Sequence, residues 1–138
     1  MSIIIAIDYG EVKSGIAVTD ESKVFAFGLA TIETKNLIDY LEKYIADKEI
    51  SEFVIGQPKK MNDEFSDIEE SIKNFISKLS LKFSKIPIFR YDERFSSKIA
   101  FKTMIDAGIS KKNRRNKYIV DKISATIILQ GYLKSKEI

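Results

Sequence analysis

Apolar and polar positions along the chain predict an α/β protein. The unbroken apolar run at residues 3–7 is typical of a central strand that is buried on both faces. Two more strand-like segments follow at 15–19 and 24–32, and a short polar turn at 20–23 separates them. Connections this short favour antiparallel neighbours, so we expect the first three strands to form a meander.

The middle of the chain alternates between helical and strand patterns. Apolar residues recur at helical spacing over 35–48 and over about 66–83. Short apolar segments at 53–56 and 88–91 predict two more strands, and the polar stretch at 57–64 predicts a loop. This order places each later strand after a helix, which favours parallel pairing.

Two further helices are expected near the end of the chain. Ser96 can cap a helix that ends at Gly108, and the last helix starts near Tyr118. The last helix is expected to present four apolar side chains to the core, namely Ile119, Ile123, Ile127 and Leu133. The whole pattern predicts one α/β domain over residues 1–138. Its core would be a five-stranded mixed sheet flanked by helices, with the first three strands antiparallel and the later ones parallel.

Composition limits the chemistry. The chain has no Cys and no His, which excludes a disulfide, a zinc site of the usual kind and a Ser–His–Asp triad. Metal chemistry must then use carboxylate oxygens, which select Mg²⁺, Mn²⁺ or Ca²⁺. The N-terminal apolar run is interrupted by Asp8 and is not preceded by basic residues, so it predicts a strand and not a signal peptide. We therefore expect a soluble, cytoplasmic protein with no membrane association.

Charge is distributed unevenly along the chain. Residues 1–81 hold nine Lys and Arg against fifteen Asp and Glu, whereas residues 82–138 hold fourteen against five. Such an uneven charge distribution favours the docking of a polyanion against the basic part of the fold, although uneven surface charge also arises by chance.

Three short stretches of the chain carry acids where a metal-dependent nuclease would need them. Asp8 ends the first strand, Asp92 and Glu93 follow a later strand, and Asp121 lies at the start of the last helix. Asp92 and Glu93 alternate in direction, so only one of them is expected to face the site. Taken singly, each acid could instead cap a turn, form an ion pair or interact with a helix dipole. Together they predict one pocket for divalent cations.

Basic residues near these acids are candidates for phosphate contacts. Lys13 lies in the glycine-containing turn after Asp8, although a plain hairpin turn explains that segment as well. The run at 111–117 places five cations in seven residues just before Asp121. A solvated loop is the usual explanation of such a run, but its position beside a candidate metal ligand favours phosphate binding. The predicted nucleic-acid contacts are Lys13, Arg94, Lys98, Lys111, Lys112, Arg114, Arg115 and Lys117.

These motifs, in this order, resemble the YqgF/RuvX family. The resemblance rests on Ile-Asp8-Tyr-Gly-x-x-Lys13-x-Gly15, Val-Ile-Gly56-x-Pro58, Asp92-Glu93-Arg94 and Asp121-Lys-x-x-Ala125, and it spans almost the whole chain. The chain departs from the family at Ser14, where many members have Arg, and in the loop after Pro58, which lacks a frequent glycine.

The resemblance implies an RNase H-like fold that is related to Holliday junction resolvases. It also implies a nuclease, dependent on Mg²⁺ or Mn²⁺, that matures the 5′ end of 16S ribosomal RNA, with the small ribosomal subunit as a partner. The family's acids fall on Asp8, Glu93 and Asp121. In the mechanism that we expect, Asp8 bridges two metal ions, and Glu93 and Asp121 each complete the shell of one ion.

Other interpretations remain open on the sequence alone. A Holliday junction resolvase would use the same acids on four-way DNA. The segment Asp8-Tyr-Gly-x-x-x-Ser-Gly15 also resembles the first phosphate loop of actin-like ATPases, which would make the chain a nucleotide-binding module. A non-catalytic RNA-binding factor is a further alternative. The sequence does not indicate the oligomeric state.

Overall fold

The computed structural model describes residues 2–58, 67–92 and 117–136, and in residues 117–122 it describes the backbone alone. Its elements in chain order are β1 (Ile3–Asp8), β2 (Lys13–Thr19), β3 (Ala26–Glu33), the 3₁₀ helix η1 (Thr34–Asn36), α1 (Leu37–Ile45), β4 (Ile50–Gln57), α2 (Glu69–Lys82), β5 (Ile88–Asp92) and α5 (Lys117–Ser135). The helix that was expected between Ser96 and Gly108 lies outside the described residues.

The five strands form one mixed sheet in the order β3-β2-β1-β4-β5. β1 is the central strand and pairs antiparallel with β2 and parallel with β4. β3 adds antiparallel to β2, and β5 adds parallel to β4. The predicted sheet is confirmed, with an antiparallel meander on one side of β1 and parallel strands on the other.

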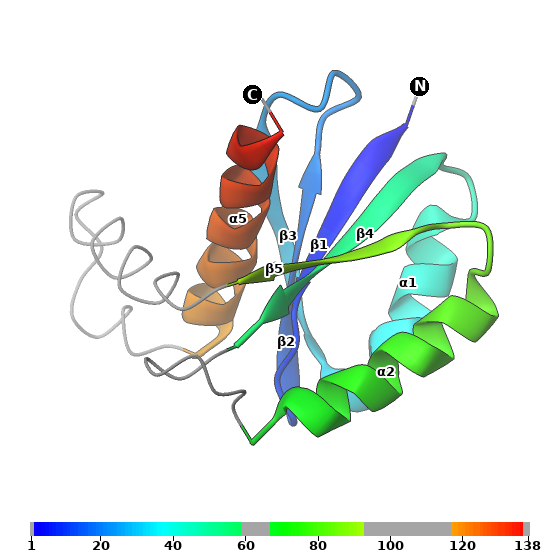
Figure 1. Ribbon diagram of the computed structural model, residues 1–138, viewed down its shortest axis with the longest axis vertical. Coiled ribbons are helices and arrows are strands. Elements are labelled where there is room, and N and C mark those ends of the chain that lie inside the picture. Colours follow the sequence, from blue (N-terminus) through cyan, green and yellow to red (C-terminus); the bar gives the residue numbers. More distant parts are fainter. Residues whose placement is uncertain (1, 59–66, 93–116, 137–138) are drawn as a thin grey trace.

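Helices cover both faces of the sheet, with α1 and α2 on one face and α5 on the other (Figure 1). The alternation of β1 supplies both cores. Ile5 and Ile7 pack in the cluster that includes residues of α1 and α2. Ile4 and Ala6 pack in the cluster that includes residues of α5. Since successive side chains of a strand point to opposite faces, Asp8 is on the same face as Ile4 and Ala6, which is the face that α5 covers.

The expected core face of the last helix was wrong. The structure buries Ala125, Ile128, Leu129 and Tyr132, which follow the i, i+3, i+4, i+7 spacing of one helical stripe. Ile123, Ile127 and Leu133 are only partly buried, and the side chain of Ile119 lies outside the described part. This helix has apolar residues on two adjoining stripes, and the stripe with the small Ala125 lies against the sheet. Periodicity alone does not distinguish the two stripes.

Several element boundaries also differ from the expected ones. β2 begins at Lys13, two residues before the predicted start, because Lys13 and Ser14 pair with Glu33 and Ile32 of β3. α2 begins at Glu69 instead of near residue 66. Within the described residues, no helix has the length and apolar character needed to cross a membrane.

Candidate active site

Asp8 lies at the carboxyl end of the central strand, between two glycines. It pairs with Gly15 of β2. On the other side, Ile7 pairs with Ile55 of β4, so the next position of the same register places Asp8 beside Gly56. Neither glycine has a side chain, so the two neighbouring strands add none beside the partly buried carboxylate of Asp8. Ligands of open α/β sheets bind at this carboxyl edge.

α5 brings the predicted Asp121 to the same face and the same end of the sheet. The helix packs against β1, β2 and β3, and Figure 1 shows it beginning at the lower end, where β1 finishes. Asp121 is the fifth residue of α5, one turn before the buried Ala125. The structure thus places Asp121 in the helix that covers the face of the sheet to which Asp8 belongs. The side chain of Asp121 is not among those described.

Glu93, the third predicted acid, lies outside the described residues. The strand that precedes it is described, and its alternation is clear. Tyr91 packs with the α5 cluster, whereas Arg90 points to α2. Asp92 lies two residues after Arg90 in the same strand, so it is on the same face as Arg90, opposite to the face that α5 covers. The expectation that Glu93 points in the other direction stays a prediction.

Most of the predicted cations cannot be placed. Arg94, Lys98, Lys111, Lys112, Arg114 and Arg115 lie outside the described residues, and of Lys117 the backbone alone is described, at the start of α5. Lys13 is partly buried and opens β2, at the same edge of the sheet as Asp8. In the part of the chain that the structure describes, no three acidic side chains come together as a metal cluster.

The turn between β1 and β2 is held by two hydroxyl groups. The hydroxyl of Thr34 donates to the carbonyl of Gly10 at 2.6 Å and lies 2.8 Å from the hydroxyl of Ser14. The backbone N–H of Gly10 donates to Ser14 Oγ at 3.2 Å. A Cβ at Gly10 would lie 2.2 Å from the carbonyl oxygen of Lys13, so this turn needs glycine at that position. Ser14 is therefore a structural residue of this turn.

A second network at this edge was missed by the sequence analysis. Arg90 donates to both carboxylate oxygens of Glu69, at 2.7 and 3.0 Å, and also to the backbone carbonyls of Ile55 and Gly56. Burial alone would raise the pKa of Glu69, but the hydrogen bonds and charge of Arg90 outweigh it and hold that pKa below its usual value. An arginine in the middle of a short apolar strand could have indicated such a partner, because a buried charge needs one.

The network fixes the ends of three elements near Asp8. Glu69 is the first residue of α2, Gly56 is next to last in β4, and Arg90 lies two residues before the end of β5. Because one guanidinium bonds to both α2 and β4, it holds these elements against β5, whose end leads directly to Glu93.

Comparison with known proteins decides the family. Residues 2–135 match the family model that is described as "RuvX: Holliday junction resolvase". The chain belongs to the RuvX family. It is 49% identical over 136 residues to a protein of Flavobacterium johnsoniae, with 99% of each chain covered. It is 44% identical over 138 residues to a protein of Bacteroides fragilis, with both chains fully covered. Both relatives bear the name "Putative pre-16S rRNA nuclease".

Solved structures of RuvC share the fold of this RuvX chain. Thermus thermophilus RuvC in complex with a Holliday junction substrate superposes with a TM-score of 0.60 at 11% sequence identity, and covers 97% of this chain and 95% of that one. A second Thermus thermophilus RuvC structure has a TM-score of 0.52. The likeness shows that the mixed sheet and its helices form an RNase H-like fold, as the sequence resemblance implied.

Proposed function

We propose that this RuvX protein is a metal-dependent nuclease that hydrolyses a phosphodiester bond of pre-16S ribosomal RNA. The observation that carries the proposal is the position of Asp8, at the carboxyl end of the central strand, between Gly15 and Gly56 and on the face covered by α5. Family membership supports a nuclease, and the name shared by the two relatives supports the RNA substrate.

The proposed metal ligands are Asp8, Glu93 and Asp121. Continuing the alternation of β5 by one residue predicts that Glu93 points to the α5 face, as Asp8 does. Helical periodicity carried back one turn from Ala125 predicts that Asp121 shares the stripe that faces the sheet. Their carboxylate oxygens suit two Mg²⁺ or Mn²⁺ ions. When bound, such ions stabilise phosphoryl charge and lower the pKa of a water molecule.

The reaction in this proposal is hydrolysis. The oxygen of water forms a bond to phosphorus, the bond from phosphorus to the 3′ oxygen breaks, and the products carry a 5′ phosphate and a 3′ hydroxyl. Asp8 would hold the metal ions in a fixed position, because it lies at the end of the central strand of the sheet, which is held by a neighbouring strand on each side. Lys13 neutralises a flanking phosphate from the same edge. Arg94, Lys98 and the basic loop at 111–117 bind the nucleic-acid backbone on either side.

A junction resolvase is the second candidate. The family model carries that description, and the RuvC structure with which the chain shares its fold is bound to a Holliday junction. The same three acids would serve either substrate. The distinction therefore rests on which nucleic acid is cut.

The test offers the purified protein two labelled substrates in the presence of Mg²⁺ or Mn²⁺. One is RNA that spans the 5′ leader of 16S rRNA, and the other is a four-way DNA junction. Asp8→Asn removes the proposed central ligand, and Asp47→Asn, an exposed acid distant from the site in sequence, is the matched control. Far-UV circular dichroism checks that both variants are folded.

Cleavage of the RNA that requires metal, survives in Asp47→Asn and disappears in Asp8→Asn is the expected result. Paired symmetric cuts in the junction, without RNA cleavage, would instead establish a resolvase. A protein that binds the RNA but cuts neither substrate would overturn the nuclease and leave an RNA-binding factor. Activity retained in Asp8→Asn would remove Asp8 from the site.

A further inference from the structure

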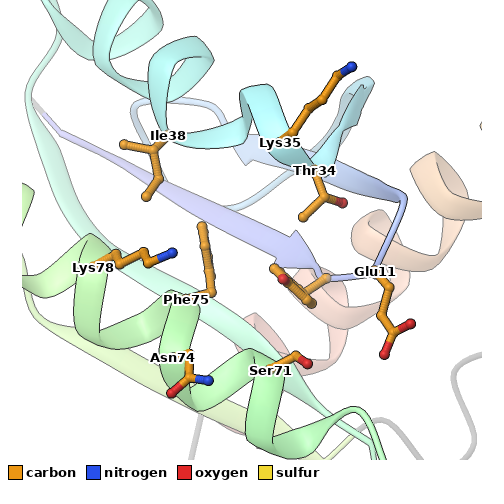
Figure 2. A pocket seen from close by; sticks show the side chains of 9 residues that line it. Glu11, Thr34, Lys35, Ile38, Ser71, Asn74, Phe75 and Lys78 are labelled. Atoms are coloured by element: carbon orange, nitrogen blue, oxygen red, sulfur yellow. The ribbon is translucent and has the colours of Figure 1, made fainter.

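A polar cavity of about 430 Å³ lies on the face of the sheet that α1 and α2 cover, beside the turn after β1. Figure 2 shows its walls, which come from that turn, from η1 and the start of α1, and from α2. The part of the wall on which the inference rests consists of Tyr9, Ile38, Ser71, Asn74, Phe75 and Lys78.

The cavity is adjacent to the proposed active site along the chain. Tyr9 directly follows Asp8, and its ring packs with the core of the α1 and α2 face. Asp8 has the parity of the α5 face, so the two residues project on opposite sides of the same strand end. A polymer that crosses the edge of the sheet at Asp8 would reach this cavity within a short distance.

One part of the wall is aromatic and apolar. The rings of Tyr9 and Phe75 lie 5.1 Å apart between centroids, at an interplanar angle of 37°. Phe75 is almost fully buried, whereas Tyr9 is partly exposed, so Tyr9 and Ile38 present the accessible apolar surface.

The other part of the wall is polar and carries a cation. Ser71, Asn74 and Lys78 lie along one stripe of α2, at spacings of three and four residues. In Figure 2 the amino group of Lys78 extends into the gap between Ile38 and Phe75. Two more charged residues belong to the lining. Lys35 pairs with Glu33 at 3.4 Å and points away from the cavity in this view, and Glu11 is exposed.

We propose that this cavity binds one unpaired nucleotide of a single-stranded segment that flanks the cleavage site. The base would lie against Tyr9 and Ile38, Asn74 and Ser71 would bond to its polar edge, and Lys78 would contact a phosphate. Aromatic contact combined with a cation is the usual way in which proteins bind single strands. The inference rests on the proposed function, because it takes nucleic acid as the substrate.

The size of the cavity selects a single strand over a duplex. A volume of about 430 Å³ lies within the range that accommodates one small ligand. A double helix keeps its bases stacked and paired, and so offers no free base to a concave site of this size. The substrate class that follows is RNA with an unpaired stretch beside the scissile bond.

The test measures binding without cleavage. Full-length protein in EDTA is titrated with a short, fluorescently labelled single-stranded oligouridylate, and separately with an RNA duplex of the same length. Lys78→Ala removes the cation of the cavity. Lys73→Ala is the matched control, because Lys73 is on the same helix but does not line the cavity. Amide shifts of the ¹⁵N-labelled protein report where the oligouridylate binds.

We expect the affinity for the single strand to be about fivefold weaker in Lys78→Ala and within about twofold of wild type in Lys73→Ala. The slope of log K against log salt should fall by about 0.7 in Lys78→Ala, because one phosphate is no longer neutralised. Duplex affinity should not change, and amide shifts should centre on Ser71, Asn74 and Lys78. Equal affinities of the two variants, no amide shifts at the cavity residues, or no binding of the oligouridylate would overturn the proposal.

The two proposals fail separately in this design. A protein that binds the oligouridylate in the cavity but cuts no substrate would retain this site and refute the nuclease. A protein that cuts RNA, yet binds the oligouridylate equally well with Lys78→Ala, would retain the nuclease and refute the site.

Discussion

Tyr91 lies against the α-carbon of Gly131, so that any side chain added at Gly131 would collide with the ring of Tyr91. A Cβ built on Gly131 would lie 2.3 Å from the hydroxyl oxygen of Tyr91 and 2.7 Å from its Cζ atom. Tyr91 is the penultimate residue of β5, two positions before Glu93, and Gly131 is in the helix that carries Asp121. This contact therefore sets how closely the strand and helix bearing two of the proposed ligands approach one another.

Gly131→Ala is expected to destabilise the protein, although the same change in an unhindered helix stabilises. Glycine to alanine inside a helix normally gains about 1 kcal/mol. Here the added methyl group collides with a packed ring, and overpacking costs about 1–3 kcal/mol. We expect a net loss of up to about 2 kcal/mol in the free energy of unfolding, measured by urea denaturation.

The control for this prediction is the same change in a Tyr91→Ala background. Without the ring, Gly131→Ala should recover the ordinary gain in helix propensity and stabilise the protein. If Gly131→Ala destabilises equally with and without Tyr91, the contact is not the cause.

Loss of the Arg90 guanidinium should destabilise the sheet edge strongly. The side chains of Arg90 and Glu69 are 23% and 5% exposed, so Arg90→Met leaves a buried carboxylate without its cation. Removing one partner of a buried pair costs about 3–5 kcal/mol, and the partial exposure of Arg90 places our expectation near the lower end. Urea denaturation measures the effect.

A matched control is Lys82→Met, which breaks an ion pair of similar length on the surface. Lys82 lies 2.8 Å from Glu42, but both side chains are about half exposed. Exposed ion pairs contribute little, so the urea midpoint of Lys82→Met should barely change. Equal losses in the two variants would show that burial does not determine the strength of the Arg90 pair.

Acid should destabilise the protein through two buried glutamates. Burial would raise the pKa of Glu52, but hydrogen bonds from Tyr132, Ser51 and Lys136 lower it, and the pKa of Glu69 is lowered by Arg90. A carboxyl whose pKa is lower in the folded state stabilises the protein above its unfolded pKa of about 4.3. That stability is lost as the pH falls through the folded pKa.

The measurement is the free energy of unfolding between about pH 6 and pH 3. Wild type should lose stability progressively below about pH 5, while a Glu52→Gln, Glu69→Gln double variant should start lower and show a flatter profile. Glu70→Gln, an exposed neighbour on α2, serves as the control and should keep the wild-type slope. A double variant with the same slope as wild type would assign the acid sensitivity to other groups.

The basic segment at 111–117 should account for much of the salt dependence of RNA binding. Replacing its five cations with alanine is expected to weaken binding and to reduce the slope of log K against log salt, by up to about 0.7 for each phosphate that the segment neutralises. Fluorescence anisotropy at several salt concentrations measures the slope. An unchanged slope would mean that the segment is solvated and does not touch phosphate.

The sequence determined the sheet and the position of its central acid. Apolar runs and the short connections between the first three strands predict β1, the antiparallel strands β2 and β3, and the parallel strands β4 and β5. They do so because these features depend on local spacing along the chain. The position of Asp8 at the end of β1 was predicted for the same reason, since an acid that ends a buried strand stands out in the sequence. The roles of Asp8, Glu93 and Asp121 as site residues stay predictions.

Tertiary structure decided which residues meet across the fold. α5 offers two apolar stripes, and only packing against the sheet selects the one with Ala125. The ion pair of Glu69 and Arg90 joins positions 21 residues apart, and the hydroxyl pair of Ser14 and Thr34 joins positions 20 apart. The physical reason is that a hydrogen bond or a packed contact depends on the distance between two groups in space. Strand register and packing determine that distance, and the local spacing of residues along the chain does not reveal it.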